Sequence, residues 1–572
     1  MSKPEKTDGE LKGLLRSIYG TVPDQLLNDL QRRIDAAQET PQRPSSLWSQ
    51  SDVVLICYAD QIRDRDCSPL TSLRQFLVDY QLQGLLKCIH LLPFCPYSSD
   101  DGFSVIDYLA VDPNAGDWGD IEALGRSFDL MFDLVLNHCS RHNEWFQRFL
   151  QDDAEFADYF VTADPSCDLS QVTRPRSLPL LTPFATPSGV KHVWTTFSDD
   201  QVDLNYANPM VLLRMLDVLI EYARRGARIV RLDAIAFLWK QIGTSCIHLP
   251  QTHAIVQLMR FMLDRIAPGT LLLTETNVPH AENVAYFGDG NEAHMVYQFS
   301  LPPLLLEAVC SGDTSLLVQW LKTIRPTYPQ TTYFNFTASH DGIGVRPLEG
   351  LVPQERIDRL VLTMQRRGGR VGMRRRADGV DVPYELNISY VDAVADVDEL
   401  SPQEHAERFL ATQAIMLSLQ GIPAVYFHSL VGSSNDLDAV AATGINRRIN
   451  RHKYQRDVLD RTLQAESSRQ RLIFDGYIKL LQVRTSQPAF HPDAAQEILD
   501  LPTDGLLGMR RTARSGECIV VVANLTTRVR NASIEFSNSN SATDLLSSEM
   551  IDLTEPIPLS PFQVRWLLVN AN

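Results

Sequence analysis

Residues 227 to 233 read Ala-Arg-Ile-Val-Arg-Leu-Asp, and residues 271 to 275 read Leu-Leu-Leu-Thr-Glu. Each stretch is a short, mainly apolar run that ends in a carboxylic acid. Such a run is typical of a strand that is buried on both faces of a parallel sheet. Six more runs of this kind make eight in all, at residues 53–58, 86–92, 130–136, 227–232, 271–274, 295–299, 331–336 and 422–427.

Helical segments lie between most of these eight runs. Buried strands that alternate with helices predict an α/β protein, and eight of them fit a (β/α)₈ TIM barrel. We expect this barrel over residues 49–139 and 206–480. A doubly wound parallel sheet is the alternative, because periodicity alone does not separate the two folds.

The chain outside the barrel falls into four parts. Residues 1–48 carry a helical period of leucine and isoleucine and are expected to form an N-terminal helical extension. Residues 140–205 and 345–400 are too long for simple loops, so we expect an inserted domain after the third strand and a lid after the seventh. Residues 481–572 contain short alternating apolar runs, which predict a C-terminal antiparallel β domain.

The overall charge excludes several classes of partner. Of the 572 residues, 70 are acidic and 53 are basic, so the formal net charge is −17. Nucleic acids and anionic membranes attract clustered Lys and Arg, and an acidic chain argues against both. The nine cysteines show no CxxC spacing, which favours reduced structural thiols. With neither a signal peptide nor a membrane span expected, we predict a cytoplasmic protein.

Polar side chains follow four of the predicted strands. They are residues 137–138 after the third strand, Asp233 and Glu275 at the fourth and fifth, and residues 340–341 beyond the seventh. A single acid at a strand end usually caps the next helix, and a single histidine usually lies in the core. In a barrel, however, these strand ends meet at one catalytic face, where three carboxylic acids would converge on one pocket.

These segments resemble the four motifs of the α-amylase family of glycoside-active enzymes (glycoside hydrolase family 13). They read Asp-Leu-Val-Leu-Asn-His at 133–138, Arg-Leu-Asp-Ala at 231–234, Thr-Glu-Thr at 274–276 and His-Asp at 340–341. Further pieces resemble the sucrose phosphorylase branch of that family, at residues 58–60, 92–94, 101–103, 243–246, 340–344 and 449–452. The resemblance rests on the order and spacing of the pieces and covers nearly the whole chain from residue 50 onward.

The resemblance implies a retaining mechanism with a covalent glycosyl-enzyme. It makes Asp233 the nucleophile, Glu275 the general acid/base and Asp341 the third carboxylate, which binds sugar hydroxyls more tightly in the transition state. Arg231 is two residues before the nucleophile, so it would orient Asp233 and keep it ionised. An apolar setting beside a second carboxylate would raise the pKa of Glu275.

The resemblance also implies a first sugar site. Four polar residues match positions that bind glucose hydroxyls: Asp100, His138, His340 and Arg447. Two aromatic residues match the walls of that site: Phe103 and Phe197. For either phenylalanine taken alone, core packing would be the more usual explanation.

A phosphorylase, unlike a hydrolase, must hold phosphate beside the scissile bond. Residues 173–176 read Thr-Arg-Pro-Arg and resemble a branch segment whose second arginine, Arg176 here, binds phosphate. Tyr384 matches the tyrosine that joins it, and an arginine fork with a phenol donor suits a phosphate dianion. The resemblance therefore implies a hexosyltransferase. An α-glucosidase or transglucosidase would leave both residues without a role, and a non-catalytic binding module would lack the three carboxylates.

The acceptor is suggested by differences from the sucrose phosphorylases. Residues 382–385 read Val-Pro-Tyr-Glu in place of Asp-Leu-Tyr-Gln, and the N-terminal extension is additional. With the run at 174–184, these features look most like the glucosylglycerate phosphorylases. Such enzymes convert 2-O-α-D-glucosylglycerate and inorganic phosphate to α-D-glucose 1-phosphate and D-glycerate.

Two more residues are candidates for the phosphate or acceptor site. Arg174 also occurs in the sucrose enzymes and does not discriminate, whereas Glu385 could hydrogen-bond a glycerate hydroxyl. The arginine-rich stretch at 366–376 is expected to be a solvated face. Sucrose, sucrose 6-phosphate and glucosylglycerol stay open as substrates. The chemistry requires no metal and no cofactor, and the oligomeric state is not predicted.

Overall fold

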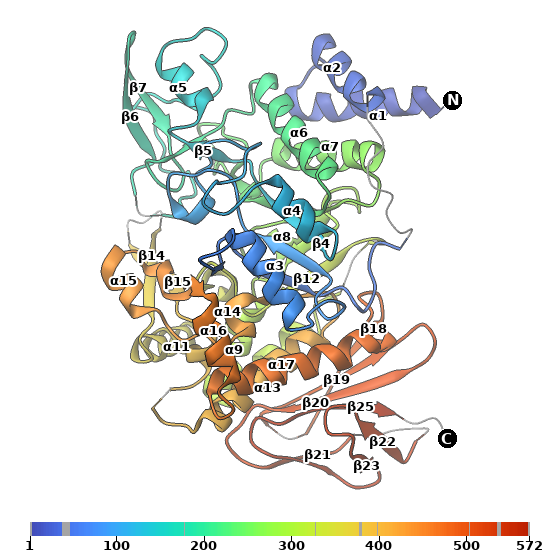
Figure 1. Cartoon of the computed structure of the whole chain (residues 1–572). Helices are drawn as coiled ribbons and strands as arrows, with labels where there is room; N and C mark the ends of the chain where they lie inside the picture. Colours follow the sequence, from blue (N-terminus) through green and yellow to red (C-terminus); the bar gives the residue numbers. More distant parts are fainter. Residues whose placement is uncertain are drawn as a thin grey trace.

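A closed barrel of eight parallel strands forms the centre of the molecule (Figure 1). The structure is a computed structural model that describes residues 3–36, 46–176, 178–325, 328–376, 380–396, 398–502, 504–534 and 539–569. The barrel strands are β1 (Val54–Cys57), β3 (Cys88–Leu91), β4 (Asp129–Val135), β9 (Ala227–Asp233), β10 (Leu271–Thr274), β11 (Met295–Tyr297), β12 (Thr332–Phe336) and β16 (Ile422–Tyr426). Strands β1 and β16 pair and close the sheet, so the predicted barrel is confirmed and the doubly wound sheet is wrong.

Helices cover the outside of the barrel. The main ones are α3 (Pro69–Asp79), α4 (Trp118–Gly125), α6 (Pro209–Arg224), α7 (Pro250–Ile266), α9 (Leu301–Ser311), α10 (Ser315–Leu321), α13 (Pro402–Ser418) and α17 (Arg469–Ser486). Several begin with proline directly after a capping side chain, as at Ser68, Asn208 and Ser401. These caps satisfy free backbone N–H groups and fix where each helix begins. All seven residues of β9 are buried, as expected for a strand covered on both faces.

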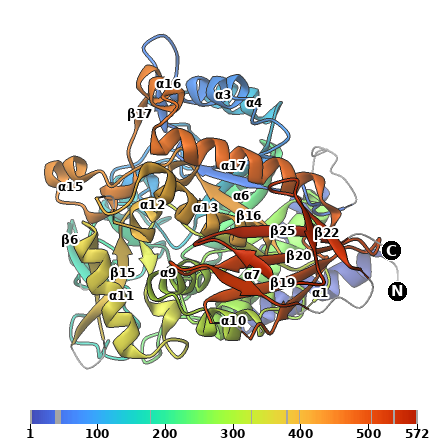
Figure 2. The ribbon, with the colours of Figure 1, turned by 90° about the horizontal axis from the view of Figure 1, so that it is seen from below.

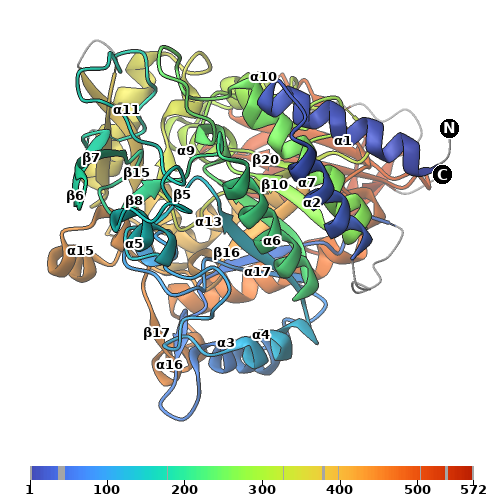
Figure 3. The same cartoon turned by 90° about the horizontal axis from the view of Figure 1, so that it is seen from above.

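Two N-terminal helices lie on the outside of the barrel beside α6 and α7 (Figure 3). They are α1 (Lys3–Tyr19) and α2 (Asp24–Asp35). Glu10 pairs with Arg265 of α7 at 2.9 Å, and Arg33 pairs with Asp217 of α6 at 2.6 Å. Residues 37–45, which end the predicted extension, lie outside the described residues.

Two long insertions stand at the carboxyl ends of the barrel strands. The first contains β5 (His138–Ser140), α5 (Glu144–Leu150), β6 (Leu181–Thr186), β7 (Gly189–Trp194) and β8 (Gln201–Asp203). The second contains β13 (Ile343–Gly344), η4 (Arg346–Leu348), α11 (Gln354–Arg366), β14 (Arg370–Arg375), β15 (Asp381–Asn387) and α12 (Tyr390–Val394). Strand β15 pairs with β13 on one side and β14 on the other, which makes a small antiparallel sheet.

A six-stranded antiparallel sheet packs against helix α13 on one side of the barrel (Figure 2). Its strands, in sheet order, are β18 (Ala495–Leu499), β19 (Leu506–Thr512), β20 (Cys518–Asn524), β25 (Val564–Val569), β22 (Ser541–Asp544) and β23 (Met550–Asp552). Trp566 of β25 is fully buried and packs its ring edge-on against Phe490, with the ring centres 4.8 Å apart. The predicted C-terminal β structure is thus confirmed.

Short elements complete the described chain. They are β2 (Ile62–Arg63), η1 (Asp100–Gly102), η2 (Ile235–Phe237), α8 (His280–Val284), η3 (Ala285–Phe287), α14 (Phe427–Leu430), α15 (Leu437–Thr443), η5 (Asn446–Asn450), β17 (Tyr454–Gln455), α16 (Arg456–Gln464), η6 (Pro488–Phe490), β21 (Arg530–Ala532) and β24 (Ile557–Leu559). Within the described ranges, no helix combines the length and the apolar character needed to cross a bilayer.

Candidate active site

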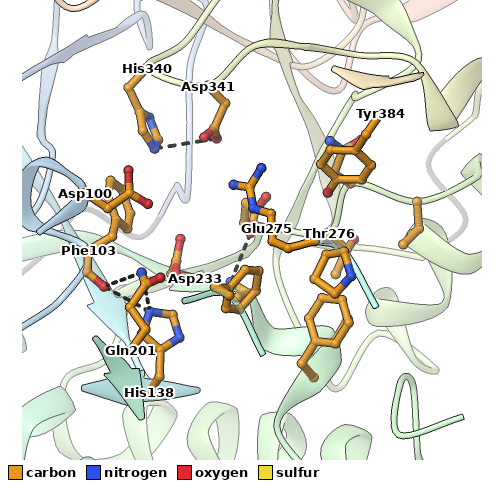
Figure 4. A pocket seen from close by; sticks show the side chains of 18 of the residues that line it. Asp100, Phe103, His138, Gln201, Asp233, Glu275, Thr276, His340, Asp341 and Tyr384 are labelled. Atoms are coloured by element: carbon orange, nitrogen blue, oxygen red, sulfur yellow. Dashed lines mark hydrogen bonds and ion pairs between the residues drawn. The ribbon is translucent and has the colours of Figure 1, made fainter. Parts of the chain in front are cut away.

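A cavity opens at the carboxyl ends of the barrel strands, between the two insertions. Eleven of the fourteen predicted site residues line it: Asp100, Phe103, His138, Arg176, Phe197, Asp233, Glu275, His340, Asp341, Tyr384 and Arg447. Figure 4 shows Asp100, Phe103 and His138 on one side and Tyr384 on the other, with Asp233 and Glu275 between them. The other three, Arg231, Arg174 and Glu385, lie behind or beside the cavity wall.

Asp233 is the last residue of β9 and is held by a buried chain of charged groups. Arg231 Nη1 donates to Asp233 Oδ1 at 2.7 Å and also contacts Asp133 of β4. The register of the two strands places Asp133 beside Arg231. His90 of β3 completes the chain, since its Nε2 lies 2.6 Å from Asp133 Oδ2. The predicted contact of Arg231 with the nucleophile is therefore present.

Asp133 keeps its charge although it is fully buried. Burial works against the charged form, but Arg231 and His90 together lower the pKa of Asp133 to about 2. Our sequence reasoning gave no role to Asp133 or His90. The sequence did contain a signal for Asp133, because this residue begins the motif at 133–138. Side chains alternate along a strand, so Asp133 faces the barrel interior together with the residue two positions later.

Glu275 follows β10 directly and lines the same cavity as Asp233. Its Oε2 accepts a hydrogen bond of 2.9 Å from the backbone N–H of Ala234 and lies 3.9 Å from Arg231 Nη2. Ala234 has a φ of +50°, a left-handed conformation that non-glycine residues rarely adopt outside functional sites. The turn after Asp233 therefore brings a backbone donor to Glu275.

Burial raises the pKa of Asp233 and of Glu275, and Arg231 opposes the rise at both carboxyls. Arg231 donates a hydrogen bond to Asp233 and lies farther from Glu275, so it favours the charged form more strongly at Asp233 than at Glu275. A protonated Glu275 beside an ionised Asp233 is the pairing that acid catalysis with a nucleophilic carboxylate requires.

Asp341 and His340 form another part of the cavity wall. Arg447 Nη1 lies 2.7 Å from Asp341 Oδ1. Burial works against the charge of Asp341, but Arg447 and Arg231 lower its pKa below the ordinary value. His340 stacks on Phe103, with ring centres 4.6 Å apart and an angle of 6° between the planes. Burial lowers the pKa of His340 well below its ordinary value, so the ring is neutral and can both donate and accept hydrogen bonds.

A strained turn places Asp100 and Phe103 in the cavity. Asp100 has a φ of +50°, and Gly102 has a φ of +112°. A Cβ at Gly102 would lie 2.6 Å from the carbonyl oxygen of Pro93, so no other residue fits there without a shift. Arg451 Nη1 holds Asp100 Oδ1 at 3.1 Å.

His138 is fixed by the backbone of the same turn. Its Nε2 lies 2.9 Å from the carbonyl oxygen of Phe103, and the Gln201 side-chain amide donates to that carbonyl at 3.1 Å. Gln201 belongs to β8 of the first insertion and also lines the cavity. Sequence reasoning missed Gln201, since a lone glutamine in a long insertion carries no motif.

Arg176 and Tyr384 come together from the two insertions. The guanidinium carbon of Arg176 lies 5.8 Å from the centre of the Tyr384 ring. Burial raises the pKa of Tyr384, which keeps the phenol protonated as a hydrogen-bond donor. The two predicted phosphate-binding residues therefore share one edge of the cavity.

Glu385 lies behind this edge and does not line the cavity. Its two oxygens accept hydrogen bonds from Arg447 Nε and Nη2 at 3.0 and 2.8 Å, and Arg176 Nη1 lies 3.5 Å away. Burial works against the charge, but Arg447 and Arg176 lower the pKa of Glu385 to about 2. Both arginines thus hold Glu385 in this structure, and its contact with a glycerate hydroxyl stays a prediction.

Arg174 also lies outside the cavity lining. Its guanidinium donates to the carbonyl oxygen of Leu178 in the same loop. Of the arginine-rich stretch at 366–376, Arg366, Arg370 and Arg375 are exposed, and Arg374 pairs with Glu349 at 2.5 Å. None of these side chains lines the cavity.

No cluster of three or more His, Cys, Asp or Glu side chains in the described ranges could hold a metal ion. Beside His138, a lysine provides the local positive charge. Lys240 Nζ lies 2.6 Å from both Asn137 Oδ1 and Asp203 Oδ2, and so ties the end of β4 to β8.

The chain matches known proteins over most of its length. Residues 78–343 match the model of the α-amylase catalytic domain. The chain is 46% identical to the glucosylglycerate phosphorylase of Escherichia coli over 557 residues, which cover 97% of this chain and 98% of that protein. It is 51% identical to the enzyme of that name from Allomeiothermus silvanus over 460 residues, with 80% and 82% covered.

A solved structure shows the same architecture. The crystal structure of sucrose 6F-phosphate phosphorylase from Thermoanaerobacter thermosaccharolyticum superposes with a TM-score of 0.74 at 26% identity, over 89% of this chain and 99% of that one. The sequence resemblance described above is confirmed. The chain therefore belongs to the α-amylase family and, within it, to the sucrose phosphorylase-like group that includes the glucosylglycerate phosphorylases.

Proposed function

We propose that this chain is a retaining glycoside phosphorylase that acts on 2-O-α-D-glucosylglycerate. It transfers the glucosyl group reversibly to inorganic phosphate, which gives α-D-glucose 1-phosphate and D-glycerate. One observation carries the proposal: Arg176 and Tyr384 share a cavity with the carboxylates Asp233, Glu275 and Asp341. The two glucosylglycerate phosphorylases with 46% and 51% identity support the choice of substrate.

In the first step, Glu275 donates its proton to the glycosidic oxygen while Asp233 attacks the anomeric carbon. The carbon–oxygen bond to glycerate breaks, and a β-linked glucosyl ester on Asp233 forms. Asp100, Asp341, His138 and His340 bind the glucose hydroxyls in this proposal. The Arg447–Asp341 ion pair holds one of these acceptors before the substrate arrives.

In the second step, phosphate takes the place of glycerate. A phosphate oxygen attacks the anomeric carbon from the side that glycerate left, and the ester bond to Asp233 breaks. Glu275 accepts the proton that a monoprotonated phosphate dianion or dihydrogen phosphate loses, so the enzyme returns to its first state. Arg176 and Tyr384 bind the other phosphate oxygens, the arginine through its charged fork and the tyrosine through its hydroxyl.

The proposal includes a cytoplasmic location. All nine cysteines are free thiols in the structure, and five of them are buried. A reducing compartment keeps such thiols in that state.

The acceptor assay in the synthetic direction tests the function. Glucose 1-phosphate is supplied with D-glycerate, glycerol, fructose or fructose 6-phosphate in parallel, and phosphate release is measured. We expect release with glycerate to exceed that with each other acceptor at least tenfold in kcat/KM. Equal release without any acceptor, with free glucose as the product, would instead identify a hydrolase.

A further inference from the structure

One arginine that lines the cavity has no part in the mechanism above. Arg346 opens η4 in the second insertion, and its side chain is 17% exposed. Within the described residues it makes one ion pair, a long one, with Nη2 3.5 Å from Glu282 Oε2. Glu282 is 41% exposed and also contacts His248 at 3.1 Å. A pair of this length with a 41% exposed glutamate contributes little, so an anion in the cavity can compete for Arg346.

The other arginines at the site either have closer acidic partners or already have a proposed role. Arg447 is bound by Asp341 and by both oxygens of Glu385. Arg231 is held between Asp133 and Asp233. Arg176 has the Glu385 contact and the proposed phosphate role. Arg346 is therefore the cavity cation most available to a second kind of anion.

The backbone holds Arg346 in a fixed place relative to the reaction. The N–H of Val345, the preceding residue, donates to the carbonyl oxygen of Tyr384 at 2.8 Å. Gly344 packs so closely on Asn277 that a Cβ there would lie 2.6 Å from Asn277 Oδ1. Asn277 is two residues beyond Glu275 and lines the cavity with it. Arg346 thus stands next to the acid/base loop and to the strand of the phosphate site.

Asn277 offers a second polar group at the same wall. Its Oδ1 is buried and has no hydrogen-bond partner among the described residues. A buried acceptor without a partner is costly unless a ligand or water supplies a donor. The Arg346 guanidinium and the Asn277 amide both belong to the cavity lining, and together they suit a small ligand that carries both a carboxylate and a hydroxyl.

We infer that Arg346 binds the carboxylate of the glycerate unit, with Asn277 accepting a hydrogen bond from one of its hydroxyls. This inference rests on the proposed function and names the residue that selects its acceptor. Glycerate and phosphate occupy the same side of the glucosyl group in turn. The structure gives them different arginines, Arg346 for the carboxylate and Arg176 for phosphate.

The test compares glycerate with glycerol, which has the same carbon chain and a hydroxymethyl group in place of the carboxylate. Kinetic constants for both acceptors are measured with glucose 1-phosphate as the donor, in the wild type and in Arg346→Gln. We expect the ratio of kcat/KM for glycerate to kcat/KM for glycerol to fall at least tenfold in R346Q, through a higher KM for glycerate. Arg346→Lys keeps the charge but loses the fork, so its ratio should fall about threefold.

Arg359→Gln is the matched control. Arg359 is an exposed arginine on α11 in the same insertion, and it should keep the wild-type ratio. If the glycerate-to-glycerol ratio of kcat/KM in R346Q equals that of the wild type, the inference is overturned. This includes an equal loss with both acceptors, which indicates a structural role. If R346Q does not fold, the ratio in R346K decides in the same way. A wild type that transfers glucose to other acceptors but not to glycerate would overturn the proposed function itself.

Discussion

The two halves of the cavity are built in different ways. In the glucose half, Asp233, Asp341 and Asp100 are each held by an arginine, at 2.7, 2.7 and 3.1 Å respectively. The acceptor half is formed by Arg176, Tyr384 and Arg346, which come from the two insertions. There the ion pairs of Arg176 and Arg346 are both 3.5 Å long.

The difference follows from what each half must bind. The glucosyl unit is common to the glucosylglycerate substrate, the glucose 1-phosphate product and the covalent intermediate of the proposed reaction, so a rigid, preorganised site serves every step. The acceptor half must release one anion and bind another in each turnover. Cations with weak internal partners suit that exchange, because tight pairing would leave no charge for the ligand.

The largest expected effect lies in the glucose half. Asp233→Ala removes the nucleophile, and we expect turnover to fall by about 10⁴-fold or more. The assay is phosphorolysis at saturating phosphate, with a thermal melt to show that the variant is folded. Activity within tenfold of the wild type would show that Asp233 does not have its proposed role. The explanation given for the rigid glucose half would then fail as well.

Glu275→Gln changes the proposed acid, which lies between the glucose half and the acceptor half of the cavity. Loss of the acid should reduce phosphorolysis of a glycoside about 10²–10⁴-fold. The pKa of Glu275 is raised by burial, so its proton is present at low pH and is lost as the pH rises through that pKa. The wild type should therefore lose activity on the alkaline side, and E275Q should lose this limb of the profile.

A substrate with a good leaving group provides the control for this variant. α-D-Glucosyl fluoride needs little acid assistance, so its reaction with Asp233 should be much less affected by E275Q than that of the glycoside. Equal losses with both substrates would contradict the acid role.

The same division explains how much the sequence could predict. The catalytic candidates of the glucose half lie at or just after the ends of barrel strands, where apolar runs mark the positions and motifs mark the residues, as for Asp233 and Glu275. Arg346 and Gln201 come from insertions and carry no such marker. Glu385 was placed near the acceptor because it adjoins Tyr384 in the chain. Successive residues of a strand point to opposite faces, and the structure accordingly puts Glu385 behind the wall.

In the acceptor half, Arg176→Ala should affect phosphate more than glucose. We expect the KM for phosphate to rise about 10–100-fold, because one charge-assisted arginine contact is lost. Formation of the glucosyl-enzyme, measured as the burst of glycerate in a single turnover, should fall much less. If phosphate binding and glucosyl-enzyme formation are impaired equally, Arg176 does not act mainly in the phosphate step. The difference between the two halves is then smaller than the geometry indicates.

Glu385→Gln should have the smallest effect on turnover and a measurable one on stability, because Glu385 joins the halves through Arg447 and Arg176. The pKa of Glu385 is lowered from 4.5 to about 2. A lowered pKa stabilises the fold above the unfolded-state value, and this stabilisation is lost as the pH falls from about 4.5 toward 2. At pH 7, E385Q should lose about 3 kcal/mol of unfolding free energy, since two partly buried arginines lose their shared buried partner.

The deficit of E385Q should therefore shrink when urea unfolding is repeated between pH 5 and pH 3. Arg359→Gln, far from this pair, should show no such pH-dependent deficit. A deficit that stays constant with pH would mean that the carboxylate charge of Glu385 does not couple the two halves.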